Sequence, residues 1–258
     1  MERSMGILSF TMTVTVGNTW GSIYLGVVFA AIFFGITSVQ SYNYYLRYPQ
    51  DWRVYKISVG ALWILDIVHL ALSTHIGYHY LIIDFGNLLA FTTVVWSQKA
   101  QITVHVLIIM IVQSLYALRV WKLGAGYNER LVPLVVTLSV LAVSVVGIIL
   151  SVLAWRNKSF LTIYQISWAI DTSFAMSTAS DIAIAVAMIY YLLKSRTSFA
   201  STNSKLASLI QYSIGAGVAT SACSLSALIA YLVMPDNLIF LAIEFSLTKL
   251  YVNSLLAM

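Results

Sequence analysis

The chain has 258 residues, of which 60% are hydrophobic and 9% are charged, with a mean hydropathy of +0.88. Soluble domains carry about 25% charged residues, so this composition excludes a globular protein that covers its surface with polar groups. Although 14 Lys and Arg outnumber 9 Asp and Glu, we expect no nucleic-acid partner, because the charges lie between apolar segments. The expected partner is the lipid bilayer.

A transmembrane helix needs roughly 20 mostly apolar residues, and seven stretches of the chain meet this requirement. They lie at about 20–41, 54–80, 99–120, 131–154, 164–193, 206–233 and 238–257. Almost nothing remains outside them. The predicted fold class is therefore all-α, an integral membrane bundle of seven transmembrane helices at 20–258, preceded by a short extracellular N-terminal segment at 1–19.

The basic residues are divided unevenly between the loops, and this division predicts the orientation. The first, third and fifth loops carry Arg47, Arg53, Lys56, Arg119, Lys122, Arg130, Lys194, Arg196 and Lys205. The opposite side carries Arg3, Lys99, Arg156 and Lys158. Because loops rich in Lys and Arg stay in the cytoplasm, we expect the N-terminus outside and the C-terminus inside. The expected location is the plasma membrane or another membrane of the secretory pathway.

The loop at 81–98, LIIDFGNLLAFTTVVWSQ, is half apolar and has a turn signal at Asp84–Asn87. It is expected either to lie along the outer membrane interface or to extend the third helix outward. The two alternatives differ in whether the residues before 99 are helical.

The fifth and sixth spans carry small residues at four-residue spacing, which allows two helices to approach closely. These rows are Ala179, Ala183, Ala187 in the fifth span, and Gly215, Ala219, Cys223 and Ser213, Gly217, Ser221 in the sixth. We therefore expect these two helices to pack together.

Several spans contain ionisable residues at bilayer depth, where a charge costs about 2.5–3.5 kcal/mol on insertion scales. Asp66 lies near the middle of the second span, with His69 and Ser73 on the same helical face. Counting from the span ends places Lys249 at nearly the same depth as Asp66, and Asp181 somewhat further inward. A cation and two carboxylates at similar depth predict a buried charge network. Other polar residues in the spans are Gln101, His105, Gln113, Asp171, Glu244, Asn253 and Ser254.

Two interpretations fit this network. In the first, Lys249 neutralises one carboxylate and the pair simply holds the bundle together. In the second, the polar groups surround a cavity for a small apolar or amphipathic ligand, an ion or a proton, and we favour this one because intramembrane charge usually marks function. The candidate residues are Asp66, His69, His105, Asp171, Asp181 and Lys249.

Two more specific chemistries fit parts of this pattern. A lysine in the middle of a seventh helix is typical of retinal Schiff-base proteins, and Asp66 or Asp181 would then be the counterion of Lys249. We favour a salt-bridge role for this lysine and expect no cofactor. Alternatively, an aspartic acid kept protonated by the bilayer can donate a proton, as in membrane cyclases of isoprenoids.

A metal site is a further alternative. His75 and His79 have the one-turn spacing that lets two imidazoles bind one metal ion. A third ligand would have to come from His69 or His105, and both His75 and His79 fall at the predicted outer interface, where histidine is ordinary. We therefore expect no metal.

Five stretches carry a resemblance to a known family: SYNYYLRYPQD, LWILDIVHLALSTHIGYHYLIIDFGN, VVWSQKAQITVHVLIIMIVQSLYALRVWKL, LLKSRTSFASTNSKLASLIQYSIGAGVATSACS and TKLYVNSLLAM. In order and spacing they resemble a fungal, basidiomycete-type family of seven-helix membrane proteins known as a domain of unknown function. The resemblance covers nearly the whole chain and implies seven helices and a fungal membrane origin, but no activity. Members continue past NSLLA with a short polar tail, so the resemblance implies that such a tail is missing after Met258.

G-protein-coupled receptors share the helix count, and Asp66 with Asn253 and Ser254 is faintly similar to their sodium site. The third span ends in LRVW instead of Asp/Glu-Arg-Tyr, and the seventh lacks Asn-Pro-x-x-Tyr, so this likeness is an analogy of fold. We expect a non-enzymatic sensor or small-ligand-binding, receptor-like protein. The alternative is a membrane enzyme using acid–base chemistry on a lipid or isoprenoid, or a proton-coupled transporter using the buried carboxylates.

Overall fold

The computed structural model describes residues 21–84, 93–157, 159, 162, 165–195, 200–234 and 237–257, with only the backbone of 200–206, 208, 209, 213 and 216. The described residues are almost entirely helical. The helices are α1 (Ser22–Arg47), α2 (Arg53–Tyr78), η2 (His79–Ile83), α3 (Trp96–Ala125), α4 (Leu131–Arg156), α5 (Ser167–Lys194), α6 (Ala200–Val233) and α7 (Ile239–Ala257). The π-helical turn η2 continues α2 without a break.

Within the described residues, seven helices are long and apolar enough to cross a membrane, counting η2 with α2. They confirm the predicted number of spans and indicate an integral membrane protein. Several helices are longer than predicted: α1 extends to Arg47 and α3 to Ala125, and α3 already begins at Trp96. The early start of α3 favours the outward extension of the third helix. The expected N-terminal segment at 1–19 and residues 85–92 lie outside the described part.

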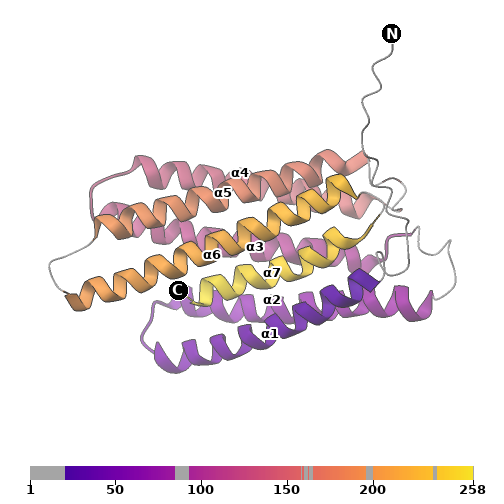
Figure 1. Cartoon of the computed structure of the whole chain (residues 1–258), viewed down its shortest axis with the longest axis horizontal. Helices are drawn as coiled ribbons and strands as arrows, with labels where there is room; N and C mark the ends of the chain where they lie inside the picture. Colours follow the sequence, from indigo (N-terminus) through magenta and orange to yellow (C-terminus); the bar gives the residue numbers. More distant parts are fainter. Residues whose placement is uncertain are drawn as a thin grey trace, which may run out of the picture.

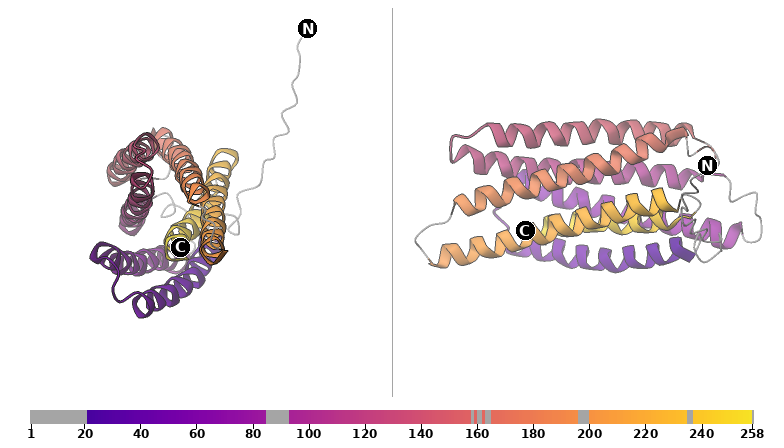
Figure 2. Two further views of the ribbon diagram at one scale, coloured as in Figure 1. Left: turned by 90° about the vertical axis from the view of Figure 1, so that its left-hand side faces the viewer. Right: turned by 45° about the horizontal axis from the view of Figure 1, so that its top comes forward.

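Helices that follow each other in the chain lie side by side, and α7 closes the bundle by packing against α1 and α6 (Figure 1). Viewed along the bundle, α3, α4 and α5 form one side and α1 and α2 the other, with α6 and α7 between them (Figure 2). α7 also contacts α2 and α3. It therefore contacts helices of both sides, which also meet directly where α2 packs against α3.

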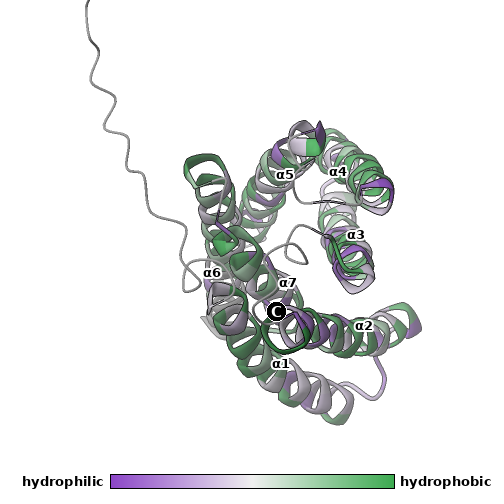
Figure 3. Ribbon diagram, turned by 90° about the vertical axis from the view of Figure 1, so that its right-hand side faces the viewer, coloured by the Kyte–Doolittle hydropathy of each residue, from purple (hydrophilic) through white to green (hydrophobic). Residues whose placement is uncertain are grey.

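The bundle carries its apolar residues on the outside as well as within. Large apolar side chains such as Ile32 of α1 and Leu138 of α4 are exposed, and apolar residues cover most of every helix (Figure 3). By contrast, Asp66, His69 and Lys249 are fully buried. This distribution is the one expected of a protein surrounded by lipid, where charged side chains face the bundle interior.

Small residues allow close approach at two helix pairs. An added Cβ at Gly26 of α1 would lie 2.7 Å from the Cα of Ala242 in α7. An added Cβ at Gly217 of α6 would lie 2.8 Å from the Cβ of Ala185 in α5. The expected packing of the fifth and sixth helices is thus present, but Gly215 has no neighbour within 4 Å of such a Cβ. Of the two glycines in the predicted rows, Gly217 makes the close contact, and its partner Ala185 lies outside the row predicted for the fifth span.

The close contact between α1 and α7 predicts a marked effect of Gly26→Ala. The new methyl group would overlap the backbone of α7, so the helices must separate, at a cost of about 1–3 kcal/mol. Thermal unfolding in detergent should show a clearly lower midpoint. Gly35→Ala on the same helix is the control, because nothing lies within 4 Å of its Cβ position. Equal midpoints for the two variants would show that α1 does not pack on α7 in this way.

Candidate functional site

Polar residues of α7 form the centre of the buried polar site. Glu244, Thr248, Lys249 and Tyr251 are all buried. Glu244, Thr248 and Tyr251 follow one face of the helix on successive turns, while Lys249 lies on another face, and their side chains meet neighbours on different helices. Three separate networks result, with partners on α2, α3 and α5.

The first network is an ion pair between α7 and α2. The Nζ of Lys249 donates to Asp66 Oδ1 at 2.5 Å and to the Asp66 backbone oxygen at 2.7 Å. It also lies 5.5 Å from the centre of the Phe34 ring. Both charged side chains are 0% exposed. The pairing agrees with the similar depths that the sequence gives these two residues.

The second network joins α2, α3 and α7 through neutral polar groups. Nε2 of His69 lies 3.0 Å from Nε2 of Gln101 and 3.2 Å from Oγ1 of Thr248. The same Thr248 oxygen lies 2.6 Å from Nδ1 of His105. Gln98 extends the chain by donating to Gln101 at 3.2 Å. Both candidate histidines are therefore linked through one threonine.

The third network surrounds Asp181 of α5. Gln113 Nε2 donates to one carboxylate oxygen at 3.0 Å, and the Tyr251 hydroxyl donates to the other at 2.5 Å. Ser177 lies 2.9 Å from the Tyr251 hydroxyl. Asp181 thus has its own hydrogen-bond donors and forms no ion pair with Lys249. The sequence placed these two residues in one charge network, and the structure places them in two.

Two other groups of polar residues lie apart from these networks. Asp171 forms no hydrogen bond or ion pair with the other five candidates, and its buried Oδ1 has no partner among the described residues. His75 lies 2.9 Å from Ser97 Oγ, and His79 lies 3.0 Å from Asp84 Oδ2. Within the described ranges, no group of three or more His, Cys, Asp and Glu is arranged to hold a metal ion.

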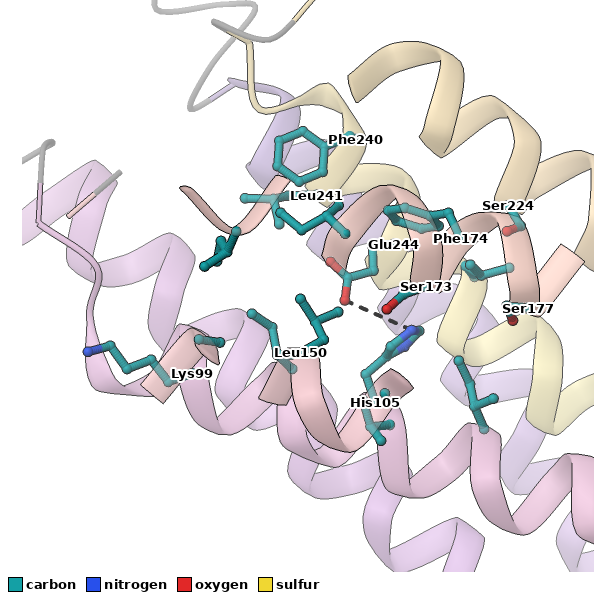
Figure 4. A pocket seen from close by; sticks show the side chains of 18 of the residues that line it. Lys99, His105, Leu150, Ser173, Phe174, Ser177, Ser224, Phe240, Leu241 and Glu244 are labelled. Atoms are coloured by element: carbon teal, nitrogen blue, oxygen red, sulfur yellow. Dashed lines mark ion pairs between the residues drawn. The ribbon is translucent and has the colours of Figure 1, made fainter. Parts of the chain in front are cut away.

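A cavity of about 110 Å³ lies between α3, α4, α5 and α7, and we call it the apolar cavity (Figure 4). Most of its wall is hydrocarbon, for example Ile109, Val143, Leu150, Phe174 and Phe240. Its polar wall residues include Glu244, His105 and Ser173, which lie near one another (Figure 4). Ser177, the last residue of the Asp181 network, also reaches this wall.

Several polar atoms at the apolar cavity lack a hydrogen-bond partner. Glu244 is 7% exposed, and its carboxylate has no closer partner among the described residues than His105 Nε2, at 4.0 Å (Figure 4). The buried Oε1 of Gln98 and the buried Oγ of Ser173 also have no partner within the described part. Buried polar groups without partners are rare and call for an explanation. All three residues line the same mainly apolar space.

Three residues that matter in this site are absent from the sequence-derived candidates. Glu244 was recognised as an intramembrane acid but not as a site residue, while Thr248 and Tyr251 carry no charge to mark them. The signal that could have found Glu244 and Thr248 is their four-residue spacing, with Lys249 next to Thr248. That spacing places polar atoms on successive turns of one helix.

The C-terminal part of the chain, residues 177–258, matches a family model described as "Family of unknown function (DUF6534)". The match supports the expected domain of unknown function. It includes Asp181, Glu244, Lys249 and Tyr251, but it does not reach Asp66 or His105. No curated protein and no solved structure matches the chain.

The buried ion pair predicts strong coupling between Asp66 and Lys249. Removing one partner leaves the other charge buried and unpaired, so Asp66→Asn and Lys249→Met should each lower the free energy of unfolding by about 3–5 kcal/mol. The double variant should lose much less than the sum of the two. Thermal unfolding of all four proteins in one detergent measures this difference. Additive losses would show that the pair does not form.

Proposed function

We propose that the protein is a non-enzymatic, receptor-like membrane protein that binds a small amphipathic ligand in the apolar cavity. The observation that supports this function is the apolar wall with a carboxylate, an amide oxygen and a hydroxyl that have no hydrogen-bond partner among the described residues. Ligand pockets typically combine a mainly apolar lining with a few convergent polar groups. A structural role alone would leave no reason for these acceptors to lie together.

The chemistry of the wall limits the ligand. The cavity volume of about 110 Å³ is somewhat below the roughly 150 Å³ of an engineered cavity that binds benzene. It therefore suits a small ring or one end of a longer chain. Glu244 and Gln98 offer acceptor oxygens, so the matching polar group on the ligand is a donor, either an amine or a hydroxyl.

We also propose an orientation in the membrane, a cellular membrane and a family for this protein. The N-terminus lies outside and the C-terminus in the cytoplasm, in the plasma membrane or another secretory-pathway membrane. This orientation is supported by Arg47, Arg53, Lys56, Arg119, Lys122, Arg130 and Lys194, which lie at the end of the bundle where α1 ends and α2 begins. Two further basic residues of the orientation argument, Arg196 and the side chain of Lys205, lie outside the described residues. Membership of the fungal seven-helix family is supported by the resemblance of the five stretches quoted above.

Ligand-observed NMR on the full chain in lipid nanodiscs tests this function, with benzylamine, benzyl alcohol and toluene as probes. We expect the amine to bind most tightly. Val143→Phe should abolish binding of all three probes, because Val143 lines the cavity. Glu244→Gln should weaken benzylamine by about tenfold, the effect of losing a charged hydrogen-bond partner, and toluene hardly at all.

The matched control is Val145→Phe on the same helix, where the side chain is 57% exposed and the added ring would face lipid. It should bind the probes like the wild type. Equal binding by Val143→Phe and Val145→Phe would place the ligand outside this cavity and contradict the proposed function.

A second candidate is proton-coupled transport, and it rests on the contacts of Asp181. Ser177 at the cavity wall, the Tyr251 hydroxyl and the Asp181 carboxylate form a continuous chain of hydrogen bonds. Such a chain connects the cavity with an intramembrane acid, the usual element of a proton relay. The ligand site would then be the transport site.

Proteoliposomes containing a pH-sensitive dye distinguish this candidate from simple binding. If the protein couples transport to protons, adding benzylamine should change the internal pH more than in protein-free vesicles, and Asp181→Asn should abolish the difference. Asp171→Asn is the control, because this aspartate lies outside the networks. A wild-type protein that binds the amine without any pH change beyond that of empty vesicles would exclude the transporter.

A further inference from the structure

A second cavity of about 480 Å³ opens at the end of the bundle where α1 ends and α2 begins, and we call it the basic-end cavity. Its wall comes from α1, the α1–α2 loop, α2, α3 and the end of α7. Unlike the mainly hydrocarbon wall of the apolar cavity, its wall combines polar and charged groups with apolar residues such as Leu115 and Leu255. Two arginines, Arg47 and Arg119, belong to this wall.

Neither arginine forms a close ion pair within the described part of the chain, although Arg119 is near enough to Asp51 of the same wall to contribute to the lowered pKa of that carboxyl. No carboxylate there lies within 4.0 Å of either guanidinium, since the ion pairs involve other residues. Arg119 is half-buried and lies 5.7 Å from the centre of the Tyr55 ring. Among the described residues, no hydrogen bond to the Arg119 guanidinium accompanies this ring contact.

Asp51 is the acidic residue of the wall, and its carboxylate is already hydrogen-bonded. One oxygen accepts a hydrogen bond from the Tyr44 hydroxyl at 2.6 Å and the other from the Trp52 backbone N–H at 2.8 Å. The Tyr44 bond lowers the pKa of Asp51, so this carboxylate is ionised at neutral pH. The cavity nevertheless keeps an excess of positive charge. Lys122, 4.3 Å from the centre of the Trp52 ring, adds a further cation nearby.

Neutral polar groups complete the lining. Gln40 lines the cavity, and the NH2 of its side-chain amide is a hydrogen-bond donor. The hydroxyls of Tyr48 and Tyr55 form no hydrogen bond with described residues and also line the cavity. Two guanidinium groups with neutral donors around them match a phosphate group, which takes several charge-assisted hydrogen bonds at once.

We propose that the basic-end cavity binds a phosphate group of the kind carried by an anionic lipid headgroup. The cavity lies at the end of the bundle that is rich in Lys and Arg, where anionic lipids of the cytoplasmic leaflet are attracted. A lipid can place its phosphate between Arg47 and Arg119 while its acyl chains stay in the bilayer. This site lies apart from the apolar cavity and does not depend on the proposed ligand there.

Native mass spectrometry of the detergent-solubilised full chain tests the proposal. The probes are dioleoyl phosphatidic acid, dioleoyl phosphatidylcholine and inorganic phosphate. We expect the wild type to prefer phosphatidic acid, and the double variant Arg47→Gln/Arg119→Gln to bind it roughly tenfold more weakly or worse, the loss expected for two charge-assisted contacts. If the double variant does not fold, Arg47→Gln alone, at an exposed position, should still weaken binding severalfold.

The matched control is Arg53→Gln/Arg130→Gln, which removes the same charge from two exposed arginines at the same end that do not line the cavity. Equal losses in both double variants would mean general surface attraction and would overturn the proposal, as would equal affinity for phosphatidylcholine. Displacement of the lipid by millimolar inorganic phosphate would support the site with free phosphate as its ligand. If millimolar inorganic phosphate does not displace the lipid, the result would support the site with a lipid headgroup as the source of the bound phosphate group.

Discussion

The burial of Lys249 is the constraint on which the rest of the bundle depends. A lysine side chain that is 0% exposed in a lipid-facing protein must have a fixed counter-charge, and Asp66 is the carboxylate bound to it. This pair fixes the rotation of α7 about its own axis. Once that rotation is set, Thr248 must face the two histidines, Tyr251 must face Asp181, and Glu244 must lie at the apolar cavity. A single charged contact therefore orders groups on three other helices.

Glycine and alanine make this arrangement sterically possible. α7 has neighbours on several sides, and at Gly26 the backbone of α1 comes too close for any side chain. Without a hydrophobic driving force between helices in lipid, such close packing and the polar contacts must supply the association energy. The polar networks and the tight α1–α7 contact therefore stabilise the same arrangement, because each keeps α7 in the position that the other requires.

The sequence predicted the parts of this structure that depend on depth in the membrane and missed those that depend on direction. Apolar stretches of about 20 residues define the helices, and similar depth made both Asp66 and Asp181 candidate partners of Lys249. Asp181 has a similar depth but lies on α5, beside Gln113 and Tyr251. Depth also could not tell that Asp171 lies apart or that Glu244 lines a cavity, because the rotation of a helix follows from packing against its neighbours.

Because the apolar cavity has a mainly hydrocarbon wall, the concentration that governs its occupancy by the proposed ligand is the concentration in the lipid. A molecule whose body suits Ile109, Val143 and Phe240 also dissolves readily in acyl chains. Its occupancy of the protein then follows its mole fraction in the bilayer and not its total concentration in water. For the proposed ligand, apparent dissociation constants should therefore rise with the amount of lipid in the sample, and only values referred to the lipid phase should agree between nanodiscs, vesicles and cells.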